Sequence, residues 1–221
     1  DLTVVKAPLT IKAANASKVY GSVLSASNNS TAFIVTGLSN AETIGAVNVV
    51  YESGAGNGNE TLDGVGVYTG KVIPSNANGG TFNANNYDIQ YTFGDLAVTK
   101  AVLTIRANDA SRMYGSVLQG TNTTKFTATG LVNSETIGSV NIDYAVGAGN
   151  GNVASDAVGV YSGKVIPADA SGGTFNANNY DINYVNGNLM VDKAPLIIRA
   201  DSKAREFGTA DPIFTASYEG F

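Results

Sequence analysis

Hydrophobic and polar residues alternate in short runs along this chain, and Gly, Asn and Pro separate the runs. A period of two residues is typical of half-buried β-strands, and no stretch of eleven or more residues shows the apolar stripe of an amphipathic helix. The pattern predicts strands over residues 9–13, 32–36, 44–51, 65–73, 87–92 and 95–99. The same pattern returns at Leu103, Thr127, Ile137, Val158, Tyr180 and Asn188. An almost entirely β fold is therefore expected.

Two glycine pairs, Phe93-Gly94 and Asn186-Gly187, stand between alternating runs. A glycine can adopt positive φ, which lets a tight turn match the twist of the flanking strands. The last two strands of each repeat are therefore predicted to form a hairpin.

The chain is a tandem array. Residues 81–91, TFNANNYDIQY, return 93 residues later as TFNANNYDINY at 174–184, and KAPLTI at Lys6 returns as KAVLTI at Lys100 and as KAPLII at Lys193. Residues that recur in register have the same structural role in each copy. We predict one repeat over 6–99, a second over 100–192 and the start of a diverged third over 193–221. Residues 1–5, DLTVV, align with DLAVT and NLMVD further on and are interpreted as the closing strand of a preceding repeat. The period leaves the phase of the structural unit open.

Six or seven short strands in about 94 residues match the size of an immunoglobulin-like sandwich. We predict tandem immunoglobulin-like antiparallel β-sandwich repeats in an elongated array, with stiff joints because no Gly/Ser linker separates the copies. The alternative is a β-grasp-like mixed sheet, which requires a helix. The candidates for that helix, 14–25 and 108–119, are interrupted by Gly21 and Gly115.

Composition narrows the possible functions. The formal net charge is −5, and the chain contains no Cys, His or Trp. The absence of a basic cluster argues against nucleic-acid binding, and no apolar run approaches the 18 residues of a membrane span, so we expect no membrane insertion in this segment. The opening residues lack the regions of a signal peptide, so an export signal would lie outside this segment. Without Cys and His, thiolate metal sites and the commonest general base are missing.

Several recurring residues are candidate sites. Glu42 and Glu135 could pair with Lys71 and Lys164, and with Asn86 or Asn179 they could form a Lys–Asn crosslink if all three groups were buried together. The plainer interpretation places Glu at a turn and Lys on a solvated strand.

Tyr87 and Tyr180 hold the position of a corner tyrosine, whose hydroxyl bonds nearby backbone. Together with the other recurring tyrosines they could instead form a platform for sugars; these are Tyr68, Tyr91, Tyr161 and Tyr184.

The GAGNGN loops at 54–59 and 147–152 have the glycine density of a phosphate cradle but lack its Gly-Lys-Ser/Thr ending and the following helix. A flexible hairpin or exposed bulge accounts for these glycines. No cofactor is expected other than a possible calcium ion, for which acidic side chains supply oxygen atoms although no calcium-loop motif is present. These side chains are Asp63, Asp88, Asp95, Asp156 and Asp181.

The string from Gly159 to Ile198, GVYSGKVIP followed by GGTFNANNYDINYVNGNLMVDKAPLII, and its earlier copy from Gly66 to Ile105 resemble the MBG and YDG-type repeats of large bacterial exoproteins. Such repeats occur in filamentous-haemagglutinin-like adhesins exported by two-partner secretion and in biofilm proteins. The third copy departs from the pattern, with Phe207 where Tyr20 and Tyr114 stand.

The resemblance implies a non-enzymatic stalk or spacer segment of a bacterial cell-surface or secreted adhesin, with no catalytic residues. The alternative is a carbohydrate-binding or cell–cell contact module. Expected partners are the neighbouring repeats, and a host or bacterial surface glycan or protein is a second candidate. The expected location is extracellular, at the bacterial cell surface.

Overall fold

The computed structural model describes residues 1–220, and nearly all of their regular structure is strand. The exceptions are two 3-10 turns, η1 (Ala84–Asn86) and η2 (Ala177–Asn179). The predicted all-β tandem class is confirmed. None of the described helical turns has the length or the apolar character of a membrane span.

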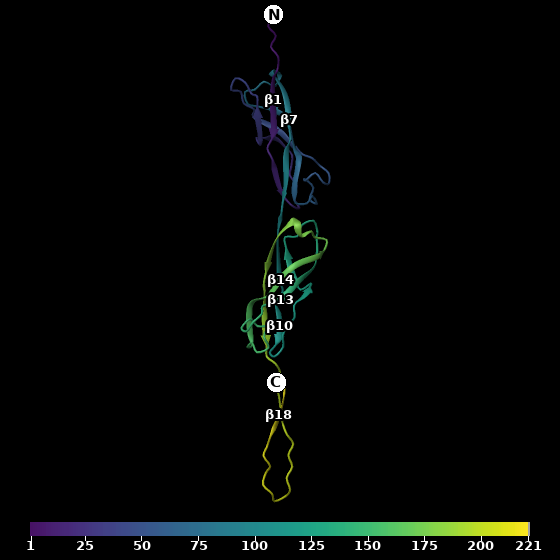
Figure 1. Cartoon of the computed structure of the whole chain (residues 1–221), viewed down its shortest axis with the longest axis vertical. Coiled ribbons are helices and arrows are strands. Elements are labelled where there is room, and N and C mark those ends of the chain that lie inside the picture. The colour runs from purple at the N-terminus through teal and green to yellow at the C-terminus, as the bar shows by residue number, and fades with distance from the viewer. Residues whose placement is uncertain (221) are drawn as a thin grey trace. The chain divides into compact units, whose positions relative to one another are not determined.

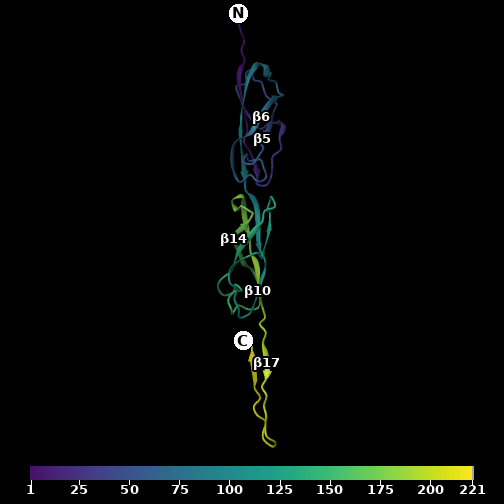
Figure 2. The same ribbon diagram turned by 90° about the vertical axis from the view of Figure 1, so that its right-hand side faces the viewer.

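The first copy folds into two sheets (Figure 1). One sheet has the order β4 (Phe33–Thr36), β1 (Ala7–Ala13), β7 (Tyr87–Thr92). The other has the order β2 (Ala16–Val19), β8 (Gly94–Thr99), β6 (Gly66–Asn78), β5 (Ala46–Tyr51), β3 (Ser27–Ser30), and Figure 2 shows β5 beside β6.

The core of the first copy lies between these sheets. On β1, alternate side chains are buried, with Leu9 exposed by 1% and Ile11 by 0%. They share one cluster with Val47 and Val49 of β5 and with residues of β6, β7 and β8, so the two sheets pack face to face as in a sandwich. The period-2 pattern of the sequence thus puts one face of each strand in the core.

The second copy repeats these elements. One sheet has the order β12 (Phe126–Thr129), β9 (Ala101–Ala107), β15 (Tyr180–Val185). The other has the order β10 (Ala110–Met113), β16 (Gly187–Asp192), β14 (Gly159–Gly173), β13 (Ile137–Tyr144), β11 (Thr121–Thr123). The third copy contributes one antiparallel pair, β17 (Ile197–Ala200) and β18 (Ala216–Glu219).

The chain forms two compact units. The first contains residues 1–103 together with 130–136 and 174–182; the second contains 104–129, 137–173 and the chain from Asn183 onward. The first unit therefore holds the whole first copy together with three short segments of the second copy, 100–103, 130–136 and 174–182.

The strand pairing is mixed, whereas a purely antiparallel sandwich was predicted. β1 pairs with β7 in parallel, β2 pairs with β8 in parallel, and β10 pairs with β16 in parallel. Parallel pairs also belong to the β-grasp alternative, but residues 14–25 and 108–119, its candidate helices, carry strands β2 and β10. A parallel pair joins strands that lie far apart in the sequence, and local alternation carries no information about such pairing.

The predicted terminal hairpins are wrong. β7 pairs with β1, while β8 lies between β2 and β6, so the chain changes sheet at Phe93. Gly94 is needed because of a close backbone approach: a Cβ there would lie 2.5 Å from the carbonyl oxygen of Ala14. Gly187 is equally constrained, at 2.7 Å from the carbonyl oxygen of Ala107.

Candidate functional site

The turn Tyr20–Gly21–Ser22 follows β2 and is hydrogen-bonded to the buried cationic side chain of Lys18. The ammonium group of Lys18, only 5% exposed, donates to the carbonyl oxygens of Ser22 at 2.8 Å and Glu60 at 2.7 Å. The backbone N–H of Tyr20 donates to the carbonyl oxygen of Thr99, the last residue of β8, at 2.9 Å. We call residues 20–22 the Tyr20 turn. The position of the turn is thus fixed by the Lys18 side chain and by the end of β8.

The glycine-rich loop of the first copy wraps around its own carboxylate. Asp63, 6% exposed, accepts the backbone N–H groups of Gly56 at 2.6 Å, Gly58 at 2.7 Å and Glu60 at 3.0 Å. The glycines let successive N–H groups converge on one anion, as in an anion-binding nest. The loop is therefore an ordered structure with an internal anion, whereas a flexible hairpin or exposed bulge was predicted.

Burial and hydrogen bonding act against each other at this carboxylate. Burial alone would raise the pKa of Asp63, but the N–H groups of Glu60, Gly56 and Gly58 together hold that pKa below its ordinary value. Burial also lowers the pKa of Lys18, and the nearby charge of Asp63 partly offsets the shift.

The second copy contains the same arrangement with arginine in place of lysine. Arg112, 5% exposed, donates to the carbonyl oxygens of Ser116 at 2.8 Å and Val153 at 2.6 Å. Asp156 accepts the N–H groups of Gly149, Gly151 and Val153, which lower its pKa. A guanidinium group presents several donors in a fixed fork, so it bonds more carbonyl groups than an ammonium group does.

Within the first compact unit, the Tyr20 turn contacts Glu135 and Tyr180 of the second copy. The Tyr20 hydroxyl donates to Glu135 Oε1 at 2.6 Å, and Glu135 Oε2 accepts the hydroxyl of Tyr180. The rings of Tyr20 and Tyr180 meet edge to face, with centroids 5.7 Å apart and an interplanar angle of 83°. One carboxylate thus joins tyrosines from successive copies, and we call these three residues the Tyr20 cluster.

Three further contacts surround the Tyr20 cluster. The N–H of Val65 donates to Asn179 Oδ1 at 3.0 Å, and Asn133 Nδ2 donates to the carbonyl oxygen of Thr61 at 2.9 Å. Gly21 has φ of +85°, and a Cβ there would come within 2.6 Å of the Val132 side chain. A residue larger than glycine would separate the turn from Val132.

The Tyr20 cluster shifts the acidity of its own members. Burial, and then the hydrogen bond to Glu135, raise the pKa of Tyr180 to about 12. The same two causes raise the pKa of Tyr20. An ionised tyrosine beside the carboxylate would be repelled, so both hydroxyls stay protonated and remain donors.

The first copy carries the same tyrosine–glutamate pair. The Tyr87 hydroxyl donates to Glu42 Oε2 at 2.6 Å and accepts the N–H of Ser39 at 3.0 Å. The hydroxyl of Tyr180 likewise accepts the N–H of Val132, at 3.1 Å. The predicted candidates Glu42 and Tyr87 therefore lie together, as do Glu135 and Tyr180.

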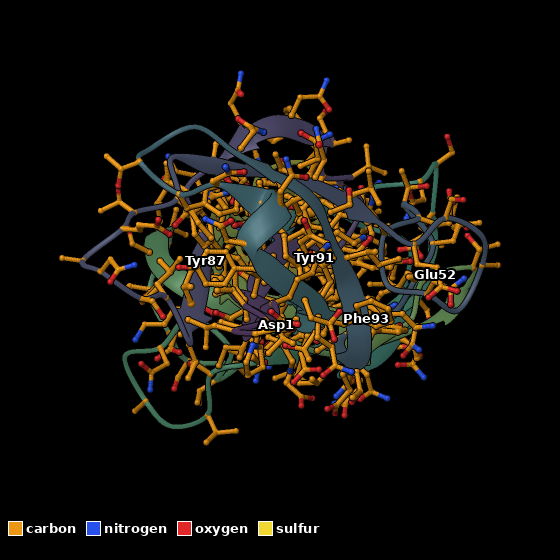
Figure 3. The ribbon with its side chains drawn as sticks, turned by 90° about the horizontal axis from the view of Figure 1, so that it is seen from above. Asp1, Glu52, Tyr87, Tyr91 and Phe93 are labelled. Carbon is orange, nitrogen blue, oxygen red and sulfur yellow. The ribbon has the colours of Figure 1, made fainter. Side chains whose placement is uncertain are left out.

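The lysines lie elsewhere. Lys71 forms an ion pair with Glu52 at 2.7 Å, and Figure 3 shows Glu52 on the opposite side of the ribbon from Tyr87. In the second copy Ala145 stands at the position of Glu52, so Lys164 lacks that ion pair. The N–H of Ala145 donates to the backbone carbonyl oxygen of Lys164 at 3.1 Å. The proposed crosslink would require Lys71 beside Glu42 and Lys164 beside Glu135, and the structure does not bring them together.

The other recurring tyrosines use their hydroxyls within their own copy. Tyr91 and Tyr184 accept the N–H groups of Ala77 and Ala170, each at 2.8 Å. Tyr68 and Tyr161 each donate at 2.8 Å to a carbonyl oxygen four residues earlier.

The acidic residues proposed for calcium are dispersed. Among residues 1–220, no three acidic side chains gather in a way that could hold a metal ion. The oxygens of Asp63 and Asp156 are occupied by loop N–H groups, and those N–H groups are the donors that a phosphate would have needed.

Sequence reasoning missed the partners of the turn. Lys18 and Arg112 stand at equivalent positions, and Arg205 stands at the third. A basic residue recurring two positions before Tyr-Gly or Phe-Gly was the available signal. Its burial and its carbonyl partners depend on a loop more than thirty residues away, which alternation does not reveal.

The Tyr20 cluster links structural parts of successive copies. No curated protein and no solved structure matches the chain. A family model described as MBG domain (YGX type) matches residues 9–97 and again residues 103–190. Tyr20-Gly21-Ser22 and Tyr114-Gly115-Ser116 each lie within one of the matched ranges. The chain belongs to the MBG domain family of the YGX type and contains two copies of that domain.

Proposed function

We propose that this chain is a non-enzymatic spacer segment of a bacterial cell-surface or secreted adhesin, and that its repeats hold a binding region away from the cell. MBG repeats occur in adhesin-like proteins and are a repeat module, not an enzyme family. The neighbouring repeats in the same chain are then its main partners, and its place is outside the cell.

The observation that carries this proposal is the Tyr20 cluster. A spacer must resist bending where one repeat follows the next, and only Lys100 separates β8 from β9. The cluster adds a charge-assisted hydrogen bond and an aromatic contact between successive copies, and the surrounding residues add two hydrogen bonds between backbone groups and amide side chains. Two chain segments cross-braced in this way have few free torsions left at the joint.

Repetition also favours a spacer over an enzyme. Most candidate groups recur in both copies at the same position, as Glu42 and Glu135 or Asp63 and Asp156 do, although Asn188 replaces Asp95. In repeat proteins stability is a sum of unit and nearest-neighbour terms, so each copy contributes similarly to reach.

Small-angle X-ray scattering on chains with one, two and four copies tests the proposal. The maximum dimension should grow by a constant increment with each added copy. In the two-copy chain, combining Tyr20→Phe with Glu135→Gln should broaden the distribution of interatomic distances. Tyr114→Phe in the same chain is the control and should leave it unchanged, because Tyr114 has no following acceptor there. A maximum dimension that stays constant as copies are added would contradict the spacer role.

A glycan array addresses the carbohydrate-binding alternative. The spacer proposal expects no saturable binding by the purified chain. Saturable binding that is lost on changing an exposed residue present in only one copy would replace the spacer by a contact module.

A further inference from the structure

The contact around the Tyr20 cluster has two halves, and the chain carries each half twice. The turn half presents a Tyr-Gly turn and two residues from the loop after the glycine-rich segment, and the acceptor half presents a glutamate, a tyrosine and two asparagines. The turn half is Tyr20, Gly21, Thr61 and Val65, repeated as Tyr114, Gly115, Ala154 and Val158. The acceptor half is Val132, Asn133, Glu135, Asn179 and Tyr180, repeated as Ser39, Asn40, Glu42, Asn86 and Tyr87.

The acceptor half of the first copy is already assembled. Glu42 Oε2 is fixed by the Tyr87 hydroxyl, and the N–H of Ser39 orients that hydroxyl as Val132 does for Tyr180. Among residues 1–220, Glu42 Oε1 has no hydrogen-bond partner, and it corresponds to the atom that receives Tyr20 in the second copy. The acceptor is therefore in place without a donor.

Exposure differs between the occupied and the open halves. Asn179 is buried at 7% exposure, whereas the equivalent Asn86 is exposed. On the turn side, Tyr20 is 4% exposed and Tyr114 is 47% exposed. Side chains of the same type are covered where the matching half is present.

Residues 1–5 indicate what fits the open acceptor. Leu2 and Val4 are 93% and 88% exposed, yet they occupy the positions of Leu96 and Val98, which are 0% and 3% exposed in β8, between β2 and β6. The Tyr20 turn is held against Thr99, at the end of that strand. A repeat that used residues 1–5 as its closing strand would hold its Tyr-Gly turn against Val5, in the same relation to Glu42 that Tyr20 has to Glu135.

We propose that the open acceptor half of the first copy, centred on Glu42, Asn86 and Tyr87, binds the Tyr-Gly turn of a further YGX-type repeat whose closing strand is residues 1–5. This interaction surface rests on the proposed spacer role, because it applies the same docking at another position. The tyrosine hydroxyl of the added repeat donates to Glu42 Oε1, and Asn86 Oδ1 accepts a backbone N–H of the added repeat.

The test uses the whole chain, extended by a further copy of residues 6–94 placed directly before Asp1. Residues 1–5 then complete the added repeat. Amide hydrogen exchange measured by NMR reports docking at the valine of the added copy that corresponds to Val65. We expect this amide to exchange at least about 10-fold more slowly than that of Val158, and similarly to that of Val65.

Two variants give matched controls. Asn86→Ala should return the valine of the added copy to the rate of Val158 and leave Val65 unchanged, and Asn179→Ala should have the converse effect. Slow exchange at the β1 and β6 amides verifies that Asn86→Ala is folded, and slow exchange at the β9 and β14 amides verifies the same for Asn179→Ala. Fast exchange at the added valine in a folded extended chain, or indifference to Asn86→Ala, would overturn the inference.

The same spectra separate this inference from the proposed function. If Val65 is protected and the added valine is not, the docking surface at Glu42 is wrong and the spacer role stands. If Val65 itself exchanges as fast as Val158, the Tyr20 cluster does not brace the copies, and the proposed function loses its support.

Discussion

At the residue scale, equivalent residues of the two copies have different energetic roles because their surroundings differ. Tyr20 is buried and donates to a carboxylate, whereas Tyr114 is half exposed, and its hydroxyl has no hydrogen bond within the described part of the chain. Sequence identity between copies therefore does not guarantee equal contributions to stability.

Tyr20→Phe should lower the free energy of unfolding of the first compact unit by about 1.5 kcal/mol, because it removes one of the two hydrogen bonds to the Glu135 carboxylate. The hydrogen bond from Tyr180 remains. Tyr114→Phe is the matched control and should change stability by less than about 0.5 kcal/mol. Urea unfolding followed by circular dichroism measures both. Equal effects of the two substitutions would show that the contact with Glu135 is not stabilising.

Asp63→Ala should destabilise the first copy by about 3 kcal/mol, since three loop N–H groups lose their acceptor and Lys18 loses the nearby charge. The amide protons of Gly56 and Gly58 should also exchange faster. Asp88→Ala, at an exposed carboxylate, is the control and should have little effect. Slow exchange of the Gly58 amide in Asp63→Ala would mean that the loop folds without its anion.

Stability should decline between about pH 10 and pH 12. In this window an unfolded tyrosine is ionised, while Tyr180, with its pKa raised to about 12, keeps its proton in the fold. The folded state then binds more protons than the unfolded state, so raising the pH favours unfolding, and the contribution is fully present below about pH 10. Thermal unfolding measured at several pH values should show this decline, and Tyr180→Phe should flatten it. A variant with an unchanged slope would assign the decline to other tyrosines.

At the element scale, the change of sheet between β7 and β8 sets the sandwich. Consecutive strands joined by a short connection usually pair with each other, but here each joins a different sheet, and β1 and β2 receive them in parallel. The close passage of β8 beside the chain after β1 is possible because position 94 has no side chain.

Gly94→Ala should lower the free energy of unfolding by about 2 kcal/mol, because the added Cβ would lie 2.5 Å from the Ala14 carbonyl oxygen and would push β8 away from β2. Gly66→Ala, in β6, is the control, since its Cβ would come no closer than 4.0 Å to Tyr68. Differential scanning calorimetry compares the two. Equal stability of the two variants would show that the backbone at Ala14 leaves room for a side chain at position 94.

The element scale also shows the limits of pattern reading. The strands over 9–13 and 87–92 were predicted from alternation and correspond to β1 and β7. β2 and β10 were not predicted, because each is four residues long and only one of its side chains is buried, a basic one. A buried Lys18 or Arg112 breaks the apolar alternation that identifies a strand.

At the scale of the whole molecule, burial depends on how much of a repeat is present. Leu9 and Ile11 are almost fully buried, whereas Leu196 and Ile198 at the same positions of the third copy are 48% and 61% exposed. β17 and β18 pair in the same manner as β1 and β4, but no second sheet covers them among the described residues.

Backbone amides of β17 and β18 should therefore exchange at least about 100-fold faster than those of β1 and β4, since an isolated two-stranded pair is only marginally stable. Hydrogen exchange followed by mass spectrometry compares the four strands in one sample. Comparable protection in the two pairs would show that hairpin pairing alone, without a covering sheet, holds the strands.

The sequence by itself determined the β class, the period of the array and the alternate burial on each strand, because these depend on residues close together in the chain. It also identified Glu42, Glu135, Tyr87 and Tyr180 as recurring candidates, but it paired the glutamates with lysines, and only the structure showed that each bonds a tyrosine. Only the tertiary structure decided which strands are parallel, where the chain changes sheet, and that Asp63 fills the glycine-rich loop. It alone showed that Tyr20 of one copy bonds Glu135 of the next. This hydrogen bond joins residues 115 positions apart, and its existence depends on how folded surfaces meet, which local pattern does not encode.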